Sequence, residues 1–92
     1  MTLSELIHQD RALFWDIGEK DLDKLNPESV IERILNYGNE KSVKQLFDIL
    51  GVEYVAKIFK NQINQPRQNY FPETVHYFNL YFSRHAPKYS HS

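Results

Sequence analysis

The strongest constraint on the fold is a series of helix start and stop signals that divides the chain into short segments. Asn26 and Pro27 predict a helix start, because asparagine caps free backbone N–H groups and proline suits the first helical position. Gly38 and Gly51 predict helix ends, since glycine readily adopts the left-handed conformation that follows many last turns. Between such signals the chain has room only for helices of about three turns.

Apolar residues recur at helical spacing within each of these segments. Val30, Ile31, Ile34 and Leu35 form one such stripe, directly after the predicted start at Asn26. No segment has the strict alternation of a half-buried strand, and no repeat is present. The spacing predicts a short helical segment at the N-terminus and helices over 27–37, 40–50, 52–63 and 72–85. We therefore expect an all-α fold, a compact bundle of four to five short helices.

The length and composition predict a single domain. The chain has 92 residues, of which 41% are apolar, enough for one packed core but not for a second lobe. We expect one helical domain over residues 1–86. Pro87 and the polar residues that follow it predict a flexible C-terminal tail over residues 87–92.

Targeting signals are not evident in the sequence. The N-terminus lacks the basic and apolar regions of a signal peptide, and no apolar run is long enough to span a membrane. The chain contains no cysteine, which suits a reducing compartment. We expect a cytoplasmic protein without a membrane partner.

The segment 42–59 resembles two helices hinged at Gly51, which is typical of a helix-turn-helix but also of an ordinary helical corner. A DNA-binding protein would use Lys57, Lys60 and Arg67 as its phosphate contacts. Phe47 argues against this reading, because the position four before the turn glycine, where the two helices meet, favours a small side chain. DNA affinity depends mainly on phosphate neutralisation, and the few basic groups available predict weak binding.

Charge is distributed unevenly between the two halves of the chain. Residues 1–50 carry six Lys or Arg against ten Asp or Glu, a net charge of −4. Residues 51–92 carry five basic groups against two acidic ones, a net charge of +3. Such a split fits a domain polarised for binding, although two solvated faces that merely differ would give the same pattern.

Catalytic and metal-binding patterns are poorly represented. The chain has no cysteine nucleophile, and its three glycines form no phosphate-binding loop. Asp21 and Asp23 share a charged segment with no third fixed ligand, so a solvated loop is the better interpretation. We predict a non-catalytic protein that has no cofactor and no metal site.

The last predicted helix, over 72–85, is apolar on more than one face. Val75, Phe78 and Phe82 form a core stripe, while Tyr77 and Tyr81 lie beside it. Tyrosine combines an apolar ring with a polar tip and is common at protein interfaces, although core tyrosines whose hydroxyls reach water would give the same sequence. The candidate protein-contact residues are Tyr77, Tyr81 and Arg84.

Three large apolar residues, Leu13, Phe14 and Trp15, stand in succession ahead of a break at Gly18. The predicted amphipathic helices over 27–37 and 40–50 would leave a groove that could receive them. We expect Trp15 to be a buried structural anchor.

Two motifs resemble those of a family of short bacterial proteins of uncharacterised function. One is Leu13-Phe14-Trp15-Asp16, and the other is the run from Ile31 to Asn39, IERILNYGN. Genes of that family often lie beside nucleotidyltransferase toxins of the abortive-infection type, so the resemblance implies an antitoxin-like or toxin-partner role. Because Arg33 lies inside the second motif, we expect it to make a fixed hydrogen bond, to a carboxylate such as Asp16 or to a helix C-terminal carbonyl.

These observations favour a small protein-interaction module, the antitoxin-like partner of a nucleotidyltransferase toxin or a self-associating domain. The alternative is a helix-turn-helix DNA-binding protein that regulates its own operon.

Overall fold

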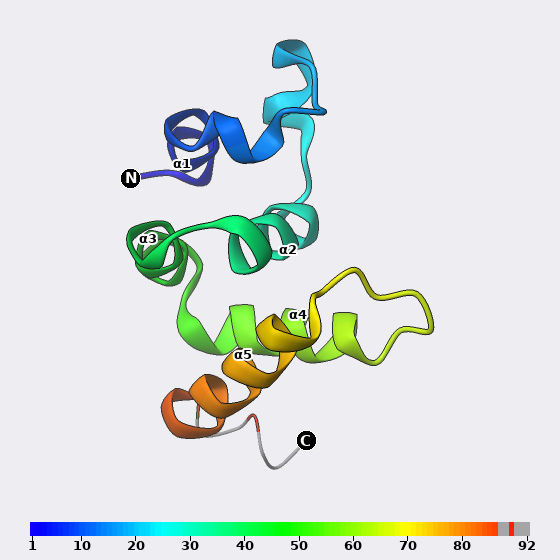
Figure 1. The fold of residues 1–92 in the computed structure, drawn as a ribbon. Helices are drawn as coiled ribbons and strands as arrows, with labels where there is room; N and C mark the ends of the chain where they lie inside the picture. Colours follow the sequence, from blue (N-terminus) through cyan, green and yellow to red (C-terminus); the bar gives the residue numbers. More distant parts are fainter. Residues whose placement is uncertain (87–88, 90–92) are drawn as a thin grey trace.

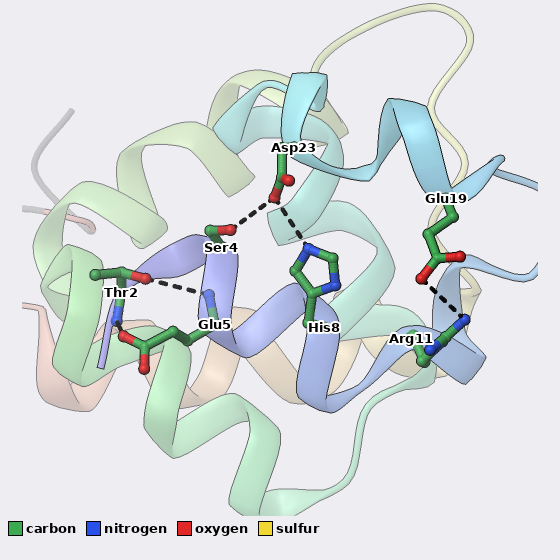
Figure 2. Close-up of polar contacts among 7 residues, drawn as sticks. All are labelled: Thr2, Ser4, Glu5, His8, Arg11, Glu19 and Asp23. Atoms are coloured by element: carbon green, nitrogen blue, oxygen red, sulfur yellow. Dashed lines mark hydrogen bonds and ion pairs between the residues drawn. The ribbon is translucent and has the colours of Figure 1, made fainter.

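Side-chain caps begin three of the α-helices in the computed structural model, which describes residues 1–86 and Tyr89. At α1 (Leu3–Gln9), the Glu5 N–H donates to Thr2 Oγ1 (3.2 Å) and the Thr2 N–H donates back to Glu5 Oε1 (2.9 Å; Figure 2). Asn26 caps α2 (Pro27–Tyr37) through Oδ1, which accepts from Ser29 N at 2.8 Å. Asn39 caps α3 (Glu40–Leu50) in the same way, through the N–H of Ser42.

The other elements are α4 (Val52–Ile63), α5 (Pro72–His85) and two 3₁₀ helices, η1 (Arg11–Phe14) and η2 (Glu19–Lys24). The described part of the chain contains no strand, so the predicted all-α class is confirmed. The helices expected over 27–37, 40–50, 52–63 and 72–85 have those bounds in the structure.

The elements are arranged in three tiers (Figure 1). The N-terminal segment with α1, η1 and η2 forms one end, α2 and α3 form the middle, and α4 and α5 form the other end. Contacts follow this order: α1 packs on α3 and η2, α2 on η1, α3 and α4, and α4 on α5. Residues 1–50 therefore occupy two tiers, while most of the basic second half lies in the third.

The core runs through all three tiers. Its fully buried side chains come from all five α-helices and from η1. The whole predicted stripe of α2, namely Val30, Ile31, Ile34 and Leu35, is buried. Phe59 of α4 is fully buried and contacts the rings of Tyr70, Phe78 and Phe82. α4 thereby joins α5 to the middle tier, since it packs on α2 and α3 as well as on α5.

Two glycines end α2 and α3 for different reasons. Gly51 has φ +87°, a conformation that L side chains rarely adopt, and its N–H donates to Phe47 O at 2.8 Å. Gly38 has φ −76°, so the expectation of a left-handed residue there is wrong. A Cβ at Gly38 would instead lie 2.6 Å from Ile34 O, and glycine is needed because the chain passes so close to the preceding turn.

Trp15 is not a buried anchor: its side chain is 84% exposed, and the prediction that it lies in the core is wrong. Phe14 takes that place and is 1% exposed. The reason is the 3₁₀ geometry of η1, whose three residues per turn point consecutive side chains about 120° apart. Only one of the three neighbours can then face α2, and the structure selects Phe14.

The predicted tail, residues 87–92, lies outside the described residues except for Tyr89. That side chain is 9% exposed and packs on Phe82, with ring centroids 5.5 Å apart. Within the described ranges, every helix is too short or too polar to cross a bilayer.

Candidate protein-interaction surfaces

A hollow of about 650 Å³ is lined in part by the exposed Trp15. We call it the Trp15 surface; η1 and its C-cap supply one side, α2 a second side, and the α4–α5 loop the rim. Beside Trp15, Tyr37 at the end of α2 is 57% exposed. The residues that line it are Ala12, Leu13, Trp15, Asp16, Glu32, Arg33, Asn36, Tyr37 and Asn69.

Arg33 fixes the floor of the Trp15 surface, as expected from the sequence motif. Its guanidinium donates two hydrogen bonds to the Asp16 carboxylate, Nη1 to Oδ1 at 2.5 Å and Nη2 to Oδ2 at 2.7 Å. Nη1 also donates to Leu13 O at 3.2 Å, and the guanidinium lies over the Phe14 ring at 5.7 Å. The predicted hydrogen bond to a carboxylate is confirmed, and it ties α2 to the turn that carries Trp15.

The same pair sets the electrostatics of the floor. The Arg33 hydrogen bond lowers the pKa of Asp16, and the carboxylate in turn raises the pKa of Arg33. Both groups therefore remain charged at neutral pH and neutralise one another.

Asparagine side chains attach the α4–α5 loop to α2. Asn36 donates from Nδ2 to Asn69 O (3.0 Å) and accepts at Oδ1 from Phe71 N (3.2 Å). The 43%-exposed Phe71 then meets Tyr37 edge to face, with ring centroids 5.4 Å apart. The loop that appeared only polar in sequence thus brings a third exposed aromatic ring beside the Trp15 surface.

A second hollow, of about 470 Å³, lies between α3 and α5, and we call it the Tyr77 groove. Tyr77 is 59% exposed above a floor that includes Val43, Phe47, Phe78 and Tyr81. The aromatic face predicted for the last helix is therefore present, with one ring largely in solvent.

The other predicted contact residues on α5, Tyr81 and Arg84, are placed differently from Tyr77. Tyr81 is half-buried and stacks on Phe47, with ring centroids 5.4 Å apart, so it also holds α5 against α3. Arg84 is exposed in the last turn of α5 but does not line the Tyr77 groove.

The three predicted DNA contacts do not form one basic surface. Lys57 and Lys60 line a hollow of about 500 Å³ on α4, whereas Arg67 lies in the α4–α5 loop beyond it. Lys60 donates from Nζ to Tyr89 O (2.9 Å) and lies over that ring at 5.3 Å, so it serves the packing of the C-terminal segment.

The exposed side of α4 is also unsuited to phosphate binding. Its exposed residues are Glu53, Tyr54, Lys57 and Asn61, one acid and one base. Phe47, expected to be too bulky for a tight helix-turn-helix, points its ring toward α5, where it contacts Tyr81 and Phe82. The Gly51 corner therefore has the connection of a helix-turn-helix without its basic recognition face.

A polar network joins α1 to η2 at the other end of the molecule (Figure 2). Ser4 Oγ donates to Asp23 Oδ1 at 2.6 Å, and His8 Nε2 lies 3.1 Å from the same oxygen. The hydrogen bond from Ser4, and to a smaller extent that from His8, lowers the pKa of Asp23. The order differs from that of a nucleophilic triad, in which histidine lies between serine and the carboxylate. Here the Ser4 hydroxyl donates its hydrogen bond directly to Asp23. The network therefore holds η2 against α1.

Metal-ligating side chains do not gather in the part of the chain that is described: no group of three His, Cys, Asp or Glu is close enough to hold an ion. Asp21, considered as a ligand beside Asp23, lies instead 3.7 Å from Lys24 Nζ.

The Trp15 surface is the feature that sequence reasoning missed. The signal was present, since a run of three large apolar residues cannot all face one neighbouring helix. Periodicity gives no direction to residues in a 3₁₀ turn, so the exposed member of the run could not be identified.

Comparison with known protein families identifies the family of this chain. A model described as a family of unknown function (DUF6922) matches residues 9–59, more than half of the chain. No curated protein and no solved structure matches it.

Proposed function

The chain belongs to DUF6922, a family of unknown function, and from its own surface we propose that it is a protein-interaction module that binds a partner protein through the Trp15 surface. The observation that carries this proposal is the 84% exposure of Trp15. A tryptophan left in solvent gains nothing for the fold, and tryptophan, tyrosine and arginine are the residues that dominate binding energy at interfaces.

The construction of the Trp15 surface supports this proposal. Its exposed rings are held on a floor fixed by the two hydrogen bonds between Arg33 and Asp16. A rigid base lowers the entropy that is lost when a partner binds. The residues matched by the family model include Trp15, Arg33 and Tyr37 but none of α5, so most of this surface belongs to the family region.

For the identity of the partner, we propose a nucleotidyltransferase toxin in a bacterial cytoplasm. This narrower proposal rests on the resemblance carried by Leu13-Phe14-Trp15-Asp16 and by the run from Ile31 to Asn39. Trp15, Asp16, Arg33 and Tyr37 of those two motifs all line the Trp15 surface. The chain would act as the antitoxin-like, non-catalytic member of the pair.

The test is to measure the dissociation constant of the chain for a nucleotidyltransferase toxin, comparing Trp15→Ala with the matched control Tyr77→Ala. Both side chains are large, aromatic and more than half exposed, so neither change should affect folding. We expect Trp15→Ala to raise the dissociation constant by about 30-fold, the effect of a hot-spot residue, and Tyr77→Ala to leave it unchanged.

Two outcomes would contradict this proposal. If the toxin binds both variants like the wild type, the Trp15 surface does not contact it. If only Tyr77→Ala weakens binding, the Tyr77 groove is the contact surface.

The second candidate, a helix-turn-helix regulator, has one observation in its favour, the joining of α3 and α4 at Gly51. It ranks below protein binding because the exposed side of α4 carries one acid and one base. Self-association is a variant of the protein-interaction proposal in which the partner is a second copy of the chain, bound at the Trp15 surface or the Tyr77 groove.

A further inference from the structure

We infer that the Trp15 surface binds an arginine side chain of its partner, held between the Trp15 ring and the Glu32 carboxylate. This inference rests on the proposed function and specifies the chemistry of the partner segment. Trp15 and Glu32 line the same hollow, Trp15 from the C-terminal end of η1 and Glu32 from α2.

The charge of the hollow is the first step. Three charged residues line it, namely Asp16, Glu32 and Arg33, which gives a net charge of −1. Arg33 is committed to Asp16 through both terminal nitrogens. Among the described residues, no basic group lies within ion-pair distance of Glu32. Its polar contact there is the Asn69 amide, at 3.4 and 3.5 Å, which leaves room for a stronger donor.

This charge discriminates between classes of partner. An acidic segment would meet Glu32 with a like charge, which costs binding energy. A purely apolar segment would exclude water from Glu32 without replacing its hydrogen bonds, which is also costly. A basic side chain supplies both the positive charge that attracts Glu32 and the hydrogen-bond donors that its carboxylate needs.

The aromatic rings then favour arginine among the basic side chains. A guanidinium is planar, stacks on a tryptophan face and can donate two hydrogen bonds to one carboxylate, whereas the lysine ammonium is a more strongly hydrated point charge. Trp15 is 84% exposed and Tyr37 57%, so a partner side chain can reach both rings.

The part of the molecule around the Trp15 surface is negatively charged, like the hollow itself. Residues 1–50, with a net charge of −4, form the two tiers that include this surface (Figure 1). A negative region of this kind attracts basic segments and raises their association rate at low salt.

The experiment uses the full chain and a short glycine–serine peptide with one central arginine. Trp15 is the sole tryptophan, so its fluorescence and its single indole N–H signal in a ¹⁵N-correlated NMR spectrum report directly on this surface. The control peptide carries citrulline, which has nearly the same shape without the charge. At low salt we expect saturable shifts of the indole signal with the arginine peptide alone.

Two substitutions locate the contact. Glu32→Gln retains one oxygen that can accept from Asn69 Nδ2 but removes the charge, and we expect it to raise the peptide dissociation constant about threefold or more. Glu53→Gln, on the exposed side of α4, is the matched control and should leave it unchanged. The inference is overturned if the citrulline peptide binds equally well, if both substitutions act alike, or if the indole signal does not move.

Failure here differs from failure of the proposed function. If Trp15→Ala releases the toxin but the arginine peptide does not bind, the surface contacts its partner through other chemistry and only this inference falls. If Trp15→Ala retains the toxin, the proposed function itself is wrong.

Discussion

Phe14, the last residue of η1, and Trp15, its C-cap, are neighbours with opposite roles. Phe14 is 1% exposed and lies under the Arg33 guanidinium, while Trp15 is 84% exposed. Burial, and not residue type or size, therefore decides which of the two rings contributes to stability.

We accordingly predict that Trp15→Ala changes the free energy of unfolding by no more than about 0.5 kcal/mol. Phe14→Ala, one position away, leaves a cavity in the core and should cost about 3–5 kcal/mol. Urea unfolding of the two variants measures both values. Trp15 fluorescence should be that of a water-exposed indole, and blue-shifted emission in the native protein would contradict the structure.

The Arg33–Asp16 pair is the second feature at residue scale, and it makes stability depend on pH. The folded pKa of Asp16 is lowered by Arg33, so the pair stabilises the fold at neutral pH. That contribution is complete above the unfolded pKa of an aspartate, about 3.9, and is lost as the pH falls through the lower folded value.

Asp16→Asn should therefore be less stable than the wild type at pH 7, and the difference should shrink as the pH falls below about 3.9. Other carboxylates affect both proteins equally, so the difference isolates Asp16. In an Arg33→Ala background the same substitution should have little effect, which a double-mutant cycle measures. A difference that is constant with pH would show that the ionised Asp16 carboxylate is not the source of the stability lost in the variant.

At the scale of elements, the helix ends depend on two glycines with different constraints. Gly51 requires glycine for its backbone angle, since nothing lies within 4 Å of an added Cβ. Gly38 has an ordinary angle but no space, with Ile34 O at 2.6 Å from that position.

We predict that Gly51→Ala costs about 1–3 kcal/mol through backbone strain alone. Gly38→Ala should also destabilise the protein, by forcing the start of α3 away from Ile34. Gly18 is the matched control, because its φ of −64° suits alanine and the nearest atom, Asp21 Oδ2, is 3.8 Å away. Gly18→Ala should be neutral or stabilising by about 0.4–1 kcal/mol. Thermal unfolding measures the stability of the three variants. Equal losses of stability at all three positions would refute this account.

At the scale of the whole molecule, the charge split of the sequence becomes a separation in space. The acidic half forms the tiers of α1, α2 and α3, and the described part of the basic half forms the tier of α4 and α5 (Figure 1). The basic groups of the lower tier are nevertheless dispersed, since Lys60 packs on Tyr89 and Arg67 lies outside the hollow that Lys57 lines.

We therefore predict that duplex DNA binds too weakly to matter at about 200 mM salt, even if some binding is measured at about 50 mM. Lys57→Glu tests the exposed side of α4 without disturbing the packing of Lys60, and it should leave any protein complex unchanged. Tight, salt-sensitive DNA binding that Lys57→Glu abolishes would make the helix-turn-helix regulator the better proposal.

Much of the fold was determined by the sequence alone, because its signals are local. Asn26 and Asn39 cap helices with their own side chains, and Gly51 ends one through its own backbone angle. Helical spacing likewise identified the buried stripe of α2 without reference to its neighbours. The carboxylate contact of Arg33 was expected from a motif resemblance and was found.

The Trp15 surface was decided only by the tertiary structure. Whether Phe14 or Trp15 faces the core depends on where α2 lies relative to a 3₁₀ turn, and no spacing rule contains that information. Phe71 reaches Tyr37 because Asn36 holds a loop more than 30 residues away in sequence. Contacts of this kind depend on how whole elements pack, and so the core could be read from the chain while the proposed binding surface could not.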